Sequence, residues 1–226
     1  MAGDVRLRAG PDGLSAGRLR YSASWLLLCA VAVGGALGVS ALAGSLGAGP
    51  CLPHALTNAL RWQPELAITE PWRCISAAWV HLSRQHLVAN LGGSVLVAAL
   101  GVVAGCGPRA ALAWALAWPL THLGLLLQPT LSAYGGLSGL LHAGVAVACV
   151  HVIRAERGQR GARRWIGAAL LAGLLAKLWL EAAWLGPLRQ VPGWDIAIAP
   201  AAHASGAAAG LLCAWAAGVG VGRTAV

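Results

Sequence analysis

The chain has 226 residues, of which 58% are hydrophobic and only 10% are charged, and its mean hydropathy is +0.69. Soluble domains carry charges on about a quarter of their residues, so this composition excludes an ordinary soluble protein and predicts a membrane protein. The formal net charge of +9 does not indicate nucleic-acid binding, because the arginines stand between apolar stretches instead of gathering on one polar face.

Apolar stretches predict membrane-spanning helices, because about twenty apolar residues are needed to cross the hydrocarbon core. They cover residues 25–46, 86–104, 110–127, 137–153, 165–185 and 201–221. We therefore expect an all-α integral membrane protein, with a six-helix membrane domain at 25–221 between short tails at 1–24 and 222–226. The first stretch contains ALA at 41–43, which resembles a signal-peptide cleavage site. Its apolar run exceeds the roughly 7–15 residues of such a signal, so we interpret it as an uncleaved span.

The arginines predict the orientation of these spans. With the N-terminus inside, the cytoplasmic segments carry Arg6, Arg8, Arg18, Arg20, Arg109, Arg154, Arg157, Arg160, Arg163, Arg164 and Arg223. The opposite side carries Arg61, Arg73, Arg84 and Arg189. Because basic residues accumulate in cytoplasmic loops, both termini are expected in the cytoplasm.

The connection at 47–83 carries Trp62, Trp72 and Trp79 among several prolines. Tryptophan prefers the boundary between membrane and water, so this segment either anchors the protein there or, as long loops often do, contributes to function. It also contains Cys51 and Cys74, which could form a disulfide on the exported side. The six cysteines show neither a CxxC pair nor the spacing of metal ligands, so we expect no metal and no cofactor.

Three polar clusters interrupt the apolar stretches, and polar groups inside a membrane indicate function by default. The first is HLSRQHLVAN at 81–90, in which His86 and Asn90 lie four residues apart on one helical face. The second is GLSG at 136–139, and the third is AHASGAAAG at 202–210. Spans two, four and six cross the membrane in the same direction, and each cluster stands near the start of its span. We therefore expect the three clusters at one depth, toward the outer side of the bilayer.

Small residues accompany these polar groups and predict a close contact between helices. The glycines concerned are Gly136, Gly139, Gly206 and Gly210. A small-xxx-small stripe lets two helix backbones approach, which would bring His203 within hydrogen-bond reach of Ser138. A serine beside an imidazole is an activated nucleophile, although no GxSxG elbow is present. The alternative is that the serine only packs between helices and that the histidine only bonds a neighbouring helix.

The three clusters together resemble the rhomboid family of intramembrane serine proteases. The resemblance lies in HxxxN, GLSG and AHxxGxxxG in spans two, four and six, and it covers residues from about 25 to 221. It implies that Ser138 is the nucleophile and His203 the general base, in a dyad without a third acid. It also implies that His86 and Asn90 stabilise the oxyanion, together with the backbone N–H at the start of the serine helix.

A narrower resemblance is to rhombosortases, compact bacterial rhomboids whose implied substrates carry a C-terminal glycine-glycine anchor. It rests on GLSGLLHA, WRCISAAWVHLSRQHLVANL and AKLWLEAAWLGP. The resemblance implies a bacterial inner-membrane protease that binds membrane-anchored substrates of this kind. His142 stands where many rhomboids have a tyrosine, and it either stacks on His203 or competes with it as the base; we favour stacking.

Charged residues near the clusters leave further alternatives open. Asp195, in the last outer loop, is the only nearby acid considered as a third catalytic member, and no spacing places it beside His203. Lys177 and Glu181 lie four residues apart within the fifth span. We favour a pair that neutralises itself, and the alternative is a contact with polar parts of a substrate.

Other functions are weighed against the rhombosortase interpretation. One is a generic rhomboid protease with other single-span substrates, and another is a rhomboid-like protein that binds membrane clients without cleaving them. The second is expected to lack the serine or the histidine, and both are present here. A small transporter is expected to show inverted repeats with broken helices, a pattern that the sequence does not contain.

Overall fold

A computed structural model describes residues 17–42, 54–155 and 160–221, and its regular structure in these ranges is helical. The long helices are α2 (Ala23–Leu42), α5 (Arg84–Ala104), α6 (Pro108–Leu123), α7 (Ser138–Arg154), α8 (Arg160–Glu181) and α9 (Pro200–Ala216). The shorter α-helices are α3 (His54–Leu60) and α4 (Arg73–Ser76). Single 3₁₀ turns cover Pro64–Leu66, Ala77–Trp79, Gly124–Leu127 and Ala183–Leu185. The prediction of an all-α protein is thereby confirmed for the described residues.

Four helices in the described part of the chain are long and apolar enough to cross a membrane. They are Ala23–Leu42, Arg84–Ala104, Pro108–Leu127 and Gly161–Leu185. The other two long helices, α7 and α9, have 17 residues each. A multi-pass membrane bundle is confirmed, whereas the count of six spans stays a prediction. The expected end of the first span at residue 46 lies outside the described residues, as does Cys51 with its suggested disulfide to Cys74.

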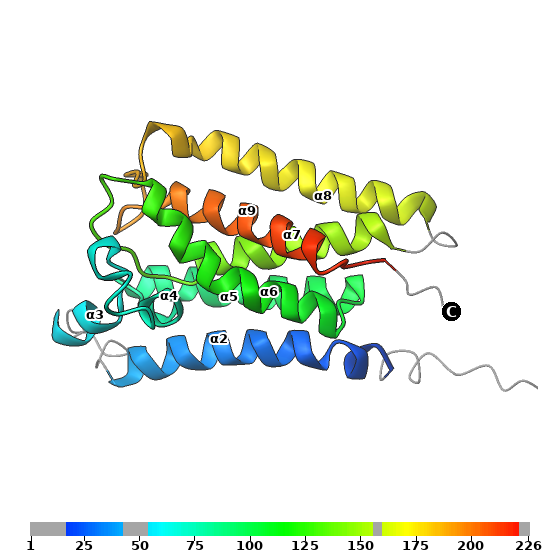
Figure 1. The fold of residues 1–226 in the computed structure, drawn as a ribbon, viewed down its shortest axis with the longest axis horizontal. Helices are drawn as coiled ribbons and strands as arrows, with labels where there is room; N and C mark the ends of the chain where they lie inside the picture. The colour runs from blue at the N-terminus through cyan, green and yellow to red at the C-terminus, as the bar shows by residue number, and fades with distance from the viewer. Residues whose placement is uncertain (1–16, 43–53, 156–159, 222–226) are drawn as a thin grey trace, which may run out of the picture.

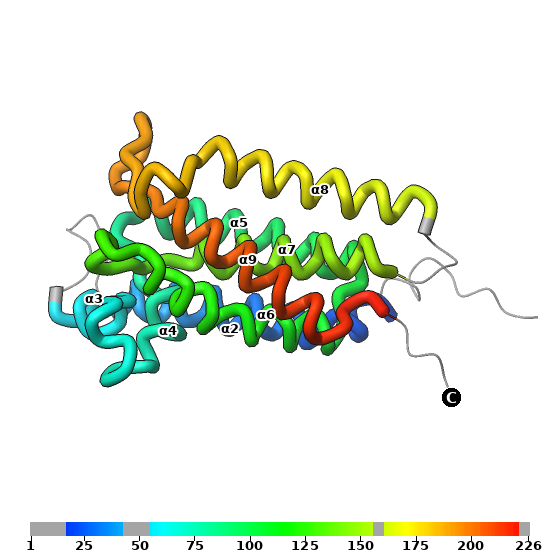
Figure 2. The backbone as a smooth tube through the Cα atoms, turned by 45° about the horizontal axis from the view of Figure 1, so that its top comes forward, coloured from blue at the N-terminus to red at the C-terminus, as the bar shows by residue number. Residues whose placement is uncertain are grey.

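The long helices run side by side along the longest axis of the molecule (Figures 1 and 2). Helix α7 packs against α5, α6, α8 and α9, while α2 and α8 lie on opposite outer sides of the bundle in Figure 1. Both views place α3, α4 and the segment 186–199 at the end of the bundle where α7 and α9 begin. The turns at 105–107 and the end of α9 lie at the other end. This arrangement agrees with the expected common level of the polar clusters.

Trp25 and Trp114 lie at the centre of the apolar core, and the indole N–H of each donates a hydrogen bond. Trp25 and Trp114 are fully buried, and their ring centroids lie 4.3 Å apart. Trp25 Nε1 donates to Val97 O at 3.1 Å, and Trp114 Nε1 donates to Leu140 O at 2.8 Å. These bonds tie α2 to α5 and α6 to α7, so bulky rings fix the spacing of four helices around the site.

Helices α7 and α9 meet backbone to backbone, as the glycine stripe predicts. A Cβ added at Gly206 would overlap Gly139 O, and one added at Gly210 would overlap Ala143 O. From the opposite side, a Cβ at Gly139 would lie 2.9 Å from Ala202 O. Only glycine fits such an approach, and the contact aligns the start of α7 with the start of α9.

Candidate active site

Ser138 is the first residue of α7, and an extended segment brings the chain to it. Tyr134 and Trp62 exchange backbone hydrogen bonds of 2.8 and 2.9 Å, and Gly136 N donates to Ala77 O at 2.9 Å. Gly136 has φ +137°, and a Cβ there would lie 2.7 Å from the His86 ring. Glycine is therefore needed at this position for two reasons: the backbone conformation favours it, and the His86 ring of α5 leaves no room for a side chain. The free N–H groups at the start of α7 favour negative charge beside Ser138.

The hydroxyl of Ser138 contacts Tyr134, a residue that the sequence analysis did not identify. Their oxygens lie 3.2 Å apart, and Tyr134 Oη also donates to Gly136 O at 3.0 Å and accepts from Gly139 N at 3.4 Å. Burial raises the pKa of Tyr134, so its phenol stays protonated. No hydrogen bond joins Ser138 to His203, although both are described and line one cavity. Their pairing stays a prediction, and catalytic hydrogen bonds often tighten only when substrate binds.

His203, on the first turn of α9, is buried and bonds a carboxylate from another helix. Its Nδ1 lies 2.7 Å from Glu181 Oε2, and Lys177 Nζ lies 2.6 Å from Glu181 Oε1. The expected Lys177–Glu181 pair is thus confirmed. The sequence analysis weighed only Asp195 as an acid for His203 and expected a dyad without a third acid, whereas the acid that contacts His203 in the structure is Glu181. No local pattern could reveal this contact, since it joins two helices 22 residues apart.

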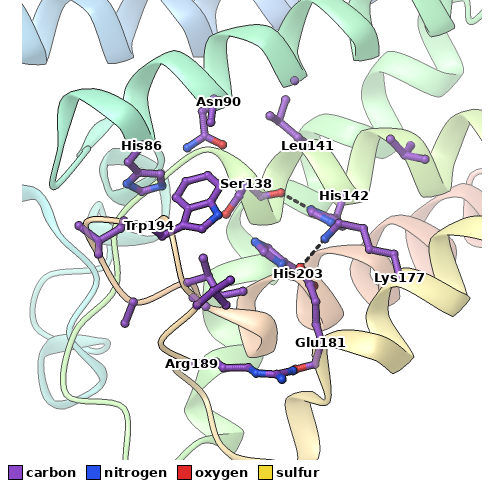
Figure 3. A pocket seen from close by; sticks show the side chains of 18 of the residues that line it. His86, Asn90, Ser138, Leu141, His142, Lys177, Glu181, Arg189, Trp194 and His203 are labelled. Carbon is purple, nitrogen blue, oxygen red and sulfur yellow. Dashed lines mark hydrogen bonds and ion pairs between the residues drawn. The ribbon is translucent and has the colours of Figure 1, made fainter.

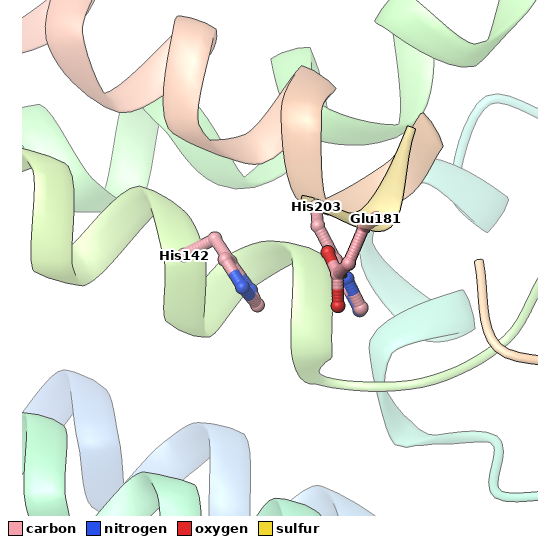
Figure 4. Close-up of side chains that lie close together, drawn as sticks. All are labelled: His142, Glu181 and His203. Atoms are coloured by element: carbon pink, nitrogen blue, oxygen red, sulfur yellow. Dashed lines mark hydrogen bonds and ion pairs between the residues drawn. The ribbon is translucent and has the colours of Figure 1, made fainter. Parts of the chain in front are cut away.

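His142 stacks on His203, which confirms the interpretation that we favoured. The ring centroids lie 4.2 Å apart with an interplanar angle of 12°, and His142 Nδ1 lies 2.6 Å from Ser138 O. His142, Glu181 and His203 (Figure 4) bring three potential metal-ligand atoms within 4.8 Å of one another. In parallel rings, however, the nitrogen lone pairs do not converge on one point, and Lys177 already occupies one oxygen of the carboxylate. The cluster therefore suits proton transfer better than metal binding.

His86 and Asn90 lie on one face of α5 and reach the same cavity as Ser138 and His203 (Figure 3). Both are buried, and His86 Nδ1 and Asn90 Nδ2 have no hydrogen-bond partner among the residues that the structure describes. A buried amide N–H without a partner costs free energy unless it serves a ligand. The His81 ring lies tilted against that of His86, with 4.8 Å between centroids, and burial together with a positive charge on His86 lowers the pKa of His81 to about 3.

The cavity has a volume of about 1110 Å³ and is lined mainly by apolar side chains of α5, α7 and α8 and of the segment 188–199. Its polar groups include the side chains discussed above, together with Arg189 and the indole of Trp194. Figure 3 shows Ser138, His203, His86 and Asn90 around one space, although they come from three helices. All three polar clusters of the sequence therefore meet, as expected.

A model of the Rhomboid domain matches residues 69–219, which is well over half of the chain. The chain belongs to the rhomboid family. Rhomboids are in general intramembrane serine proteases. The matched region contains Ser138, His86, His203 and Asn90, which are described above. No curated protein shows a significant match to the chain.

This rhomboid holds the segment 188–199 against the start of α5 through polar contacts. Ser83 Oγ donates to Asp195 Oδ1 at 2.7 Å, and Gln85 Nε2 donates to Gly193 O at 2.8 Å. Ser83 also accepts from His86 N at 3.0 Å and so caps α5. Asp195 therefore has a structural place in this rhomboid, at the rim of the cavity, in contact with the cap of the helix that carries His86.

Proposed function

We propose that this rhomboid is an intramembrane serine endopeptidase in which Ser138 is the nucleophile and His203 the general base. The observation that carries the proposal is the common cavity: a serine at a helix N-terminus, a buried histidine and an Asn90 amide without a partner among the described residues line one mainly apolar space. A packing serine needs none of these neighbours. A nucleophile needs all of them, because it must lose a proton and its product oxyanion must find donors.

The chemistry follows from these positions. Ser138 Oγ attacks the carbonyl carbon of the scissile bond while its proton passes to His203 Nε2. The carbonyl oxygen becomes an anion, for which the Ser138 backbone N–H, Asn90 Nδ2 and a ring N–H of His86 are the donors. His203 then gives the proton to the leaving amine, and an acyl-enzyme ester remains. A water molecule attacks the ester, gives a proton to His203, and the proton returns to Ser138 as the acid product leaves.

We take the substrate to be a protein with a C-terminal glycine-glycine anchor, as the rhombosortase resemblance implies. A peptide bond inside a helix is shielded by the turn around it, and glycine weakens a helix by about 1 kcal/mol relative to alanine. A glycine pair at the top of a single span would unwind easily and would present no side chain to the crowded region beside Gly136. The apolar cavity walls suit the remaining hydrophobic anchor.

The topology of the proposal has six spans in a bacterial inner membrane, with both termini in the cytoplasm. Helices α7 and α9, at 17 residues, are about 26 Å long, close to the hydrocarbon thickness of roughly 30 Å. Arg154 is the last residue of α7, and Arg163 and Arg164 lie near the start of α8. In Figure 1 these helix ends lie at the end of the bundle away from the site, which agrees with a cytoplasmic position. The single membrane domain then runs from 25 to 221.

The decisive experiment uses an exported reporter fused to a Gly-Gly pair, an apolar segment of about twenty residues and a basic end. The reporter is co-expressed with wild-type protein, with Ser138→Ala, or with Ser132→Ala as a control at an exposed serine nearby. We expect release of the reporter by the wild type and by Ser132→Ala, and none by Ser138→Ala. A fluorophosphonate probe is likewise expected to label the wild type and Ser132→Ala but not Ser138→Ala.

Two outcomes would contradict parts of the proposal separately. If the tail with Leu-Leu in place of Gly-Gly is processed normally, the protein is a protease of generic rhomboid specificity, and the glycine-glycine assignment is wrong. If no tail is cleaved and the fluorophosphonate does not label Ser138, the protein is not a serine protease. Client binding without cleavage would then be the remaining function.

A further inference from the structure

A carboxylate holds the proposed catalytic base from the side opposite to the nucleophile. Glu181 is the last residue of α8, and its Oε2 lies 2.7 Å from Nδ1 of His203 on α9. The His203 side chain is only 9% exposed and that of Glu181 17% exposed, so water has little access to the contact. A charge-assisted hydrogen bond in such surroundings is stronger than one at a surface.

The backbone around Glu181 is held in place by two further features. Ala182 adopts the left-handed conformation, with φ 54° and ψ 55°, and so ends α8 directly after the glutamate. Arg189 Nη1 donates to Leu180 O at 3.1 Å and to Glu181 O at 3.5 Å. Alanine in this conformation is strained, and such strain persists where the surrounding structure over-determines a functional position.

The two oxygens of Glu181 have separate partners. Oε1 bonds Lys177 Nζ at 2.6 Å, and Oε2 bonds His203. A carboxylate present only to neutralise Lys177 would not need to face a buried imidazole on another helix. The lysine balances the charge of the carboxylate within an apolar cavity, which lowers the cost of placing an anion there.

We propose that Glu181 is a positioning residue that completes a Ser138–His203–Glu181 triad, an inference that rests on the proposed serine protease function. The carboxylate accepts the Nδ1–H of His203 and thereby fixes the tautomer whose Nε2 lone pair is free. That lone pair takes the proton of Ser138 Oγ when the peptide carbonyl is attacked. The resulting imidazolium is stabilised by the negative charge on its far side, and the proton then passes to the leaving amine.

The test measures inactivation of the full-length protein by a fluorophosphonate and cleavage of the Gly-Gly reporter. Glu181→Gln keeps the shape but removes the charge, and we expect kcat and the inactivation rate constant to fall by about 10²–10⁴-fold, as when a triad aspartate becomes asparagine. KM and the inhibitor constant should stay within about threefold, because the effect lies in the transition state. Glu181→Asp should recover part of the rate. Glu65→Gln, at an exposed glutamate, is the matched control and should behave as wild type.

A double variant separates positioning from stability. In a His203→Ala background, Glu181→Gln should not lower the residual rate of fluorophosphonate labelling any further, because Glu181 acts through the histidine. An equal loss in both backgrounds, or a Glu181→Gln rate within threefold of wild type, overturns the triad. In either case the proposed function stands as long as wild type cleaves and Ser138→Ala does not. If Glu181→Gln does not accumulate as folded protein, Glu181→Asp decides: a fall in kcat with an unchanged KM supports the triad, and a rate within threefold of wild type contradicts it.

Discussion

Two contacts place the proposed catalytic groups, and they are built in different ways. Between α7 and α9 the backbones touch, because Gly206 and Gly210 leave no side chain between the helices. Between α8 and α9 the contact near the site is polar and depends on Glu181 reaching His203. The first contact is rigid and depends on shape, and the second depends on charge. The proposed nucleophile and base therefore lie on α7 and α9, a pair of helices locked together, whereas the proposed supporting acid comes from the more peripheral helix α8.

The largest effect is expected from a substitution that separates α7 from α9. Gly206→Val adds atoms that overlap the carbonyl of Gly139, and a backbone carbonyl cannot move aside as a flexible side chain can. Overpacking costs typically about 1–3 kcal/mol, occasionally more, and a backbone clash belongs at the upper end. We expect loss of folded protein or a large fall in Tm in detergent, with loss of cleavage.

Gly92→Val is the matched control for this prediction. Gly92 lies on the exposed face of α5, and a Cβ there would meet no atom within 4 Å. Its Tm should stay close to that of the wild type. Equal stability of the two valine variants would mean that α7 and α9 do not depend on backbone contact.

The next effect separates the two stacked histidines. His203→Ala should abolish reporter cleavage without preventing membrane insertion, because His203 is the proposed acceptor of the Ser138 proton. His142→Ala should leave measurable activity, since His142 Nδ1 is occupied by Ser138 O and its ring supports His203 by stacking. Membrane fractionation and the reporter assay together check both statements. Cleavage by His203→Ala combined with a dead His142→Ala would exchange the two roles.

The sequence predicts the contact between α7 and α9, but of the two bonds that Glu181 makes it predicts only the one to Lys177. The glycine stripe repeats at helical spacing, so a local pattern predicted both the contact and the level of Ser138 and His203. The Lys177–Glu181 pair was also readable, because i and i+4 share a face. That Glu181 turns its second oxygen to His203 depends on how α8 packs against α9, and no spacing within one helix encodes it.

Tyr134, which contacts Ser138, illustrates the same limit of sequence reasoning. It stands four residues before Ser138, in a segment without helical or strand periodicity. Its hydroxyl reaches the serine only because a backbone pair with Trp62 and the positive φ of Gly136 fold the chain back on itself. The signal in the sequence was a tyrosine close to the GLSG motif. Its contact with Ser138 becomes apparent only from the conformation of the segment.

Replacing the proposed oxyanion donors on α5 is expected to reduce cleavage less than replacing His203. Asn90→Ala and His86→Ala should each raise the barrier by about 2.7–4 kcal/mol, which corresponds to a fall of roughly 10²–10³-fold in kcat with little change in KM. The buried Asn90 amide has no partner among the described residues, so removing it should not lower the Tm much. Asn58→Ala, at an exposed asparagine outside the bundle helices, is the control. Unchanged kcat in both site variants would make these residues packing groups.

The smallest effect is expected from Lys177→Met, which removes the cation of the polar contact and leaves its acid in place. The Lys177 side chain is 47% exposed, and ion pairs with one exposed partner contribute about 0–1 kcal/mol. Glu181 would keep its bond to His203 and would carry an unbalanced charge in the cavity. We therefore expect a fall in kcat of less than about tenfold, clearly less than for Glu181→Gln. A loss from Lys177→Met as large as that from Glu181→Gln would mean that the ion pair as a whole, and not the carboxylate alone, orients the base. In that case both Lys177 and Glu181 of α8 would be needed for activity. The peripheral helix α8 would then be as important for the site as α7 and α9.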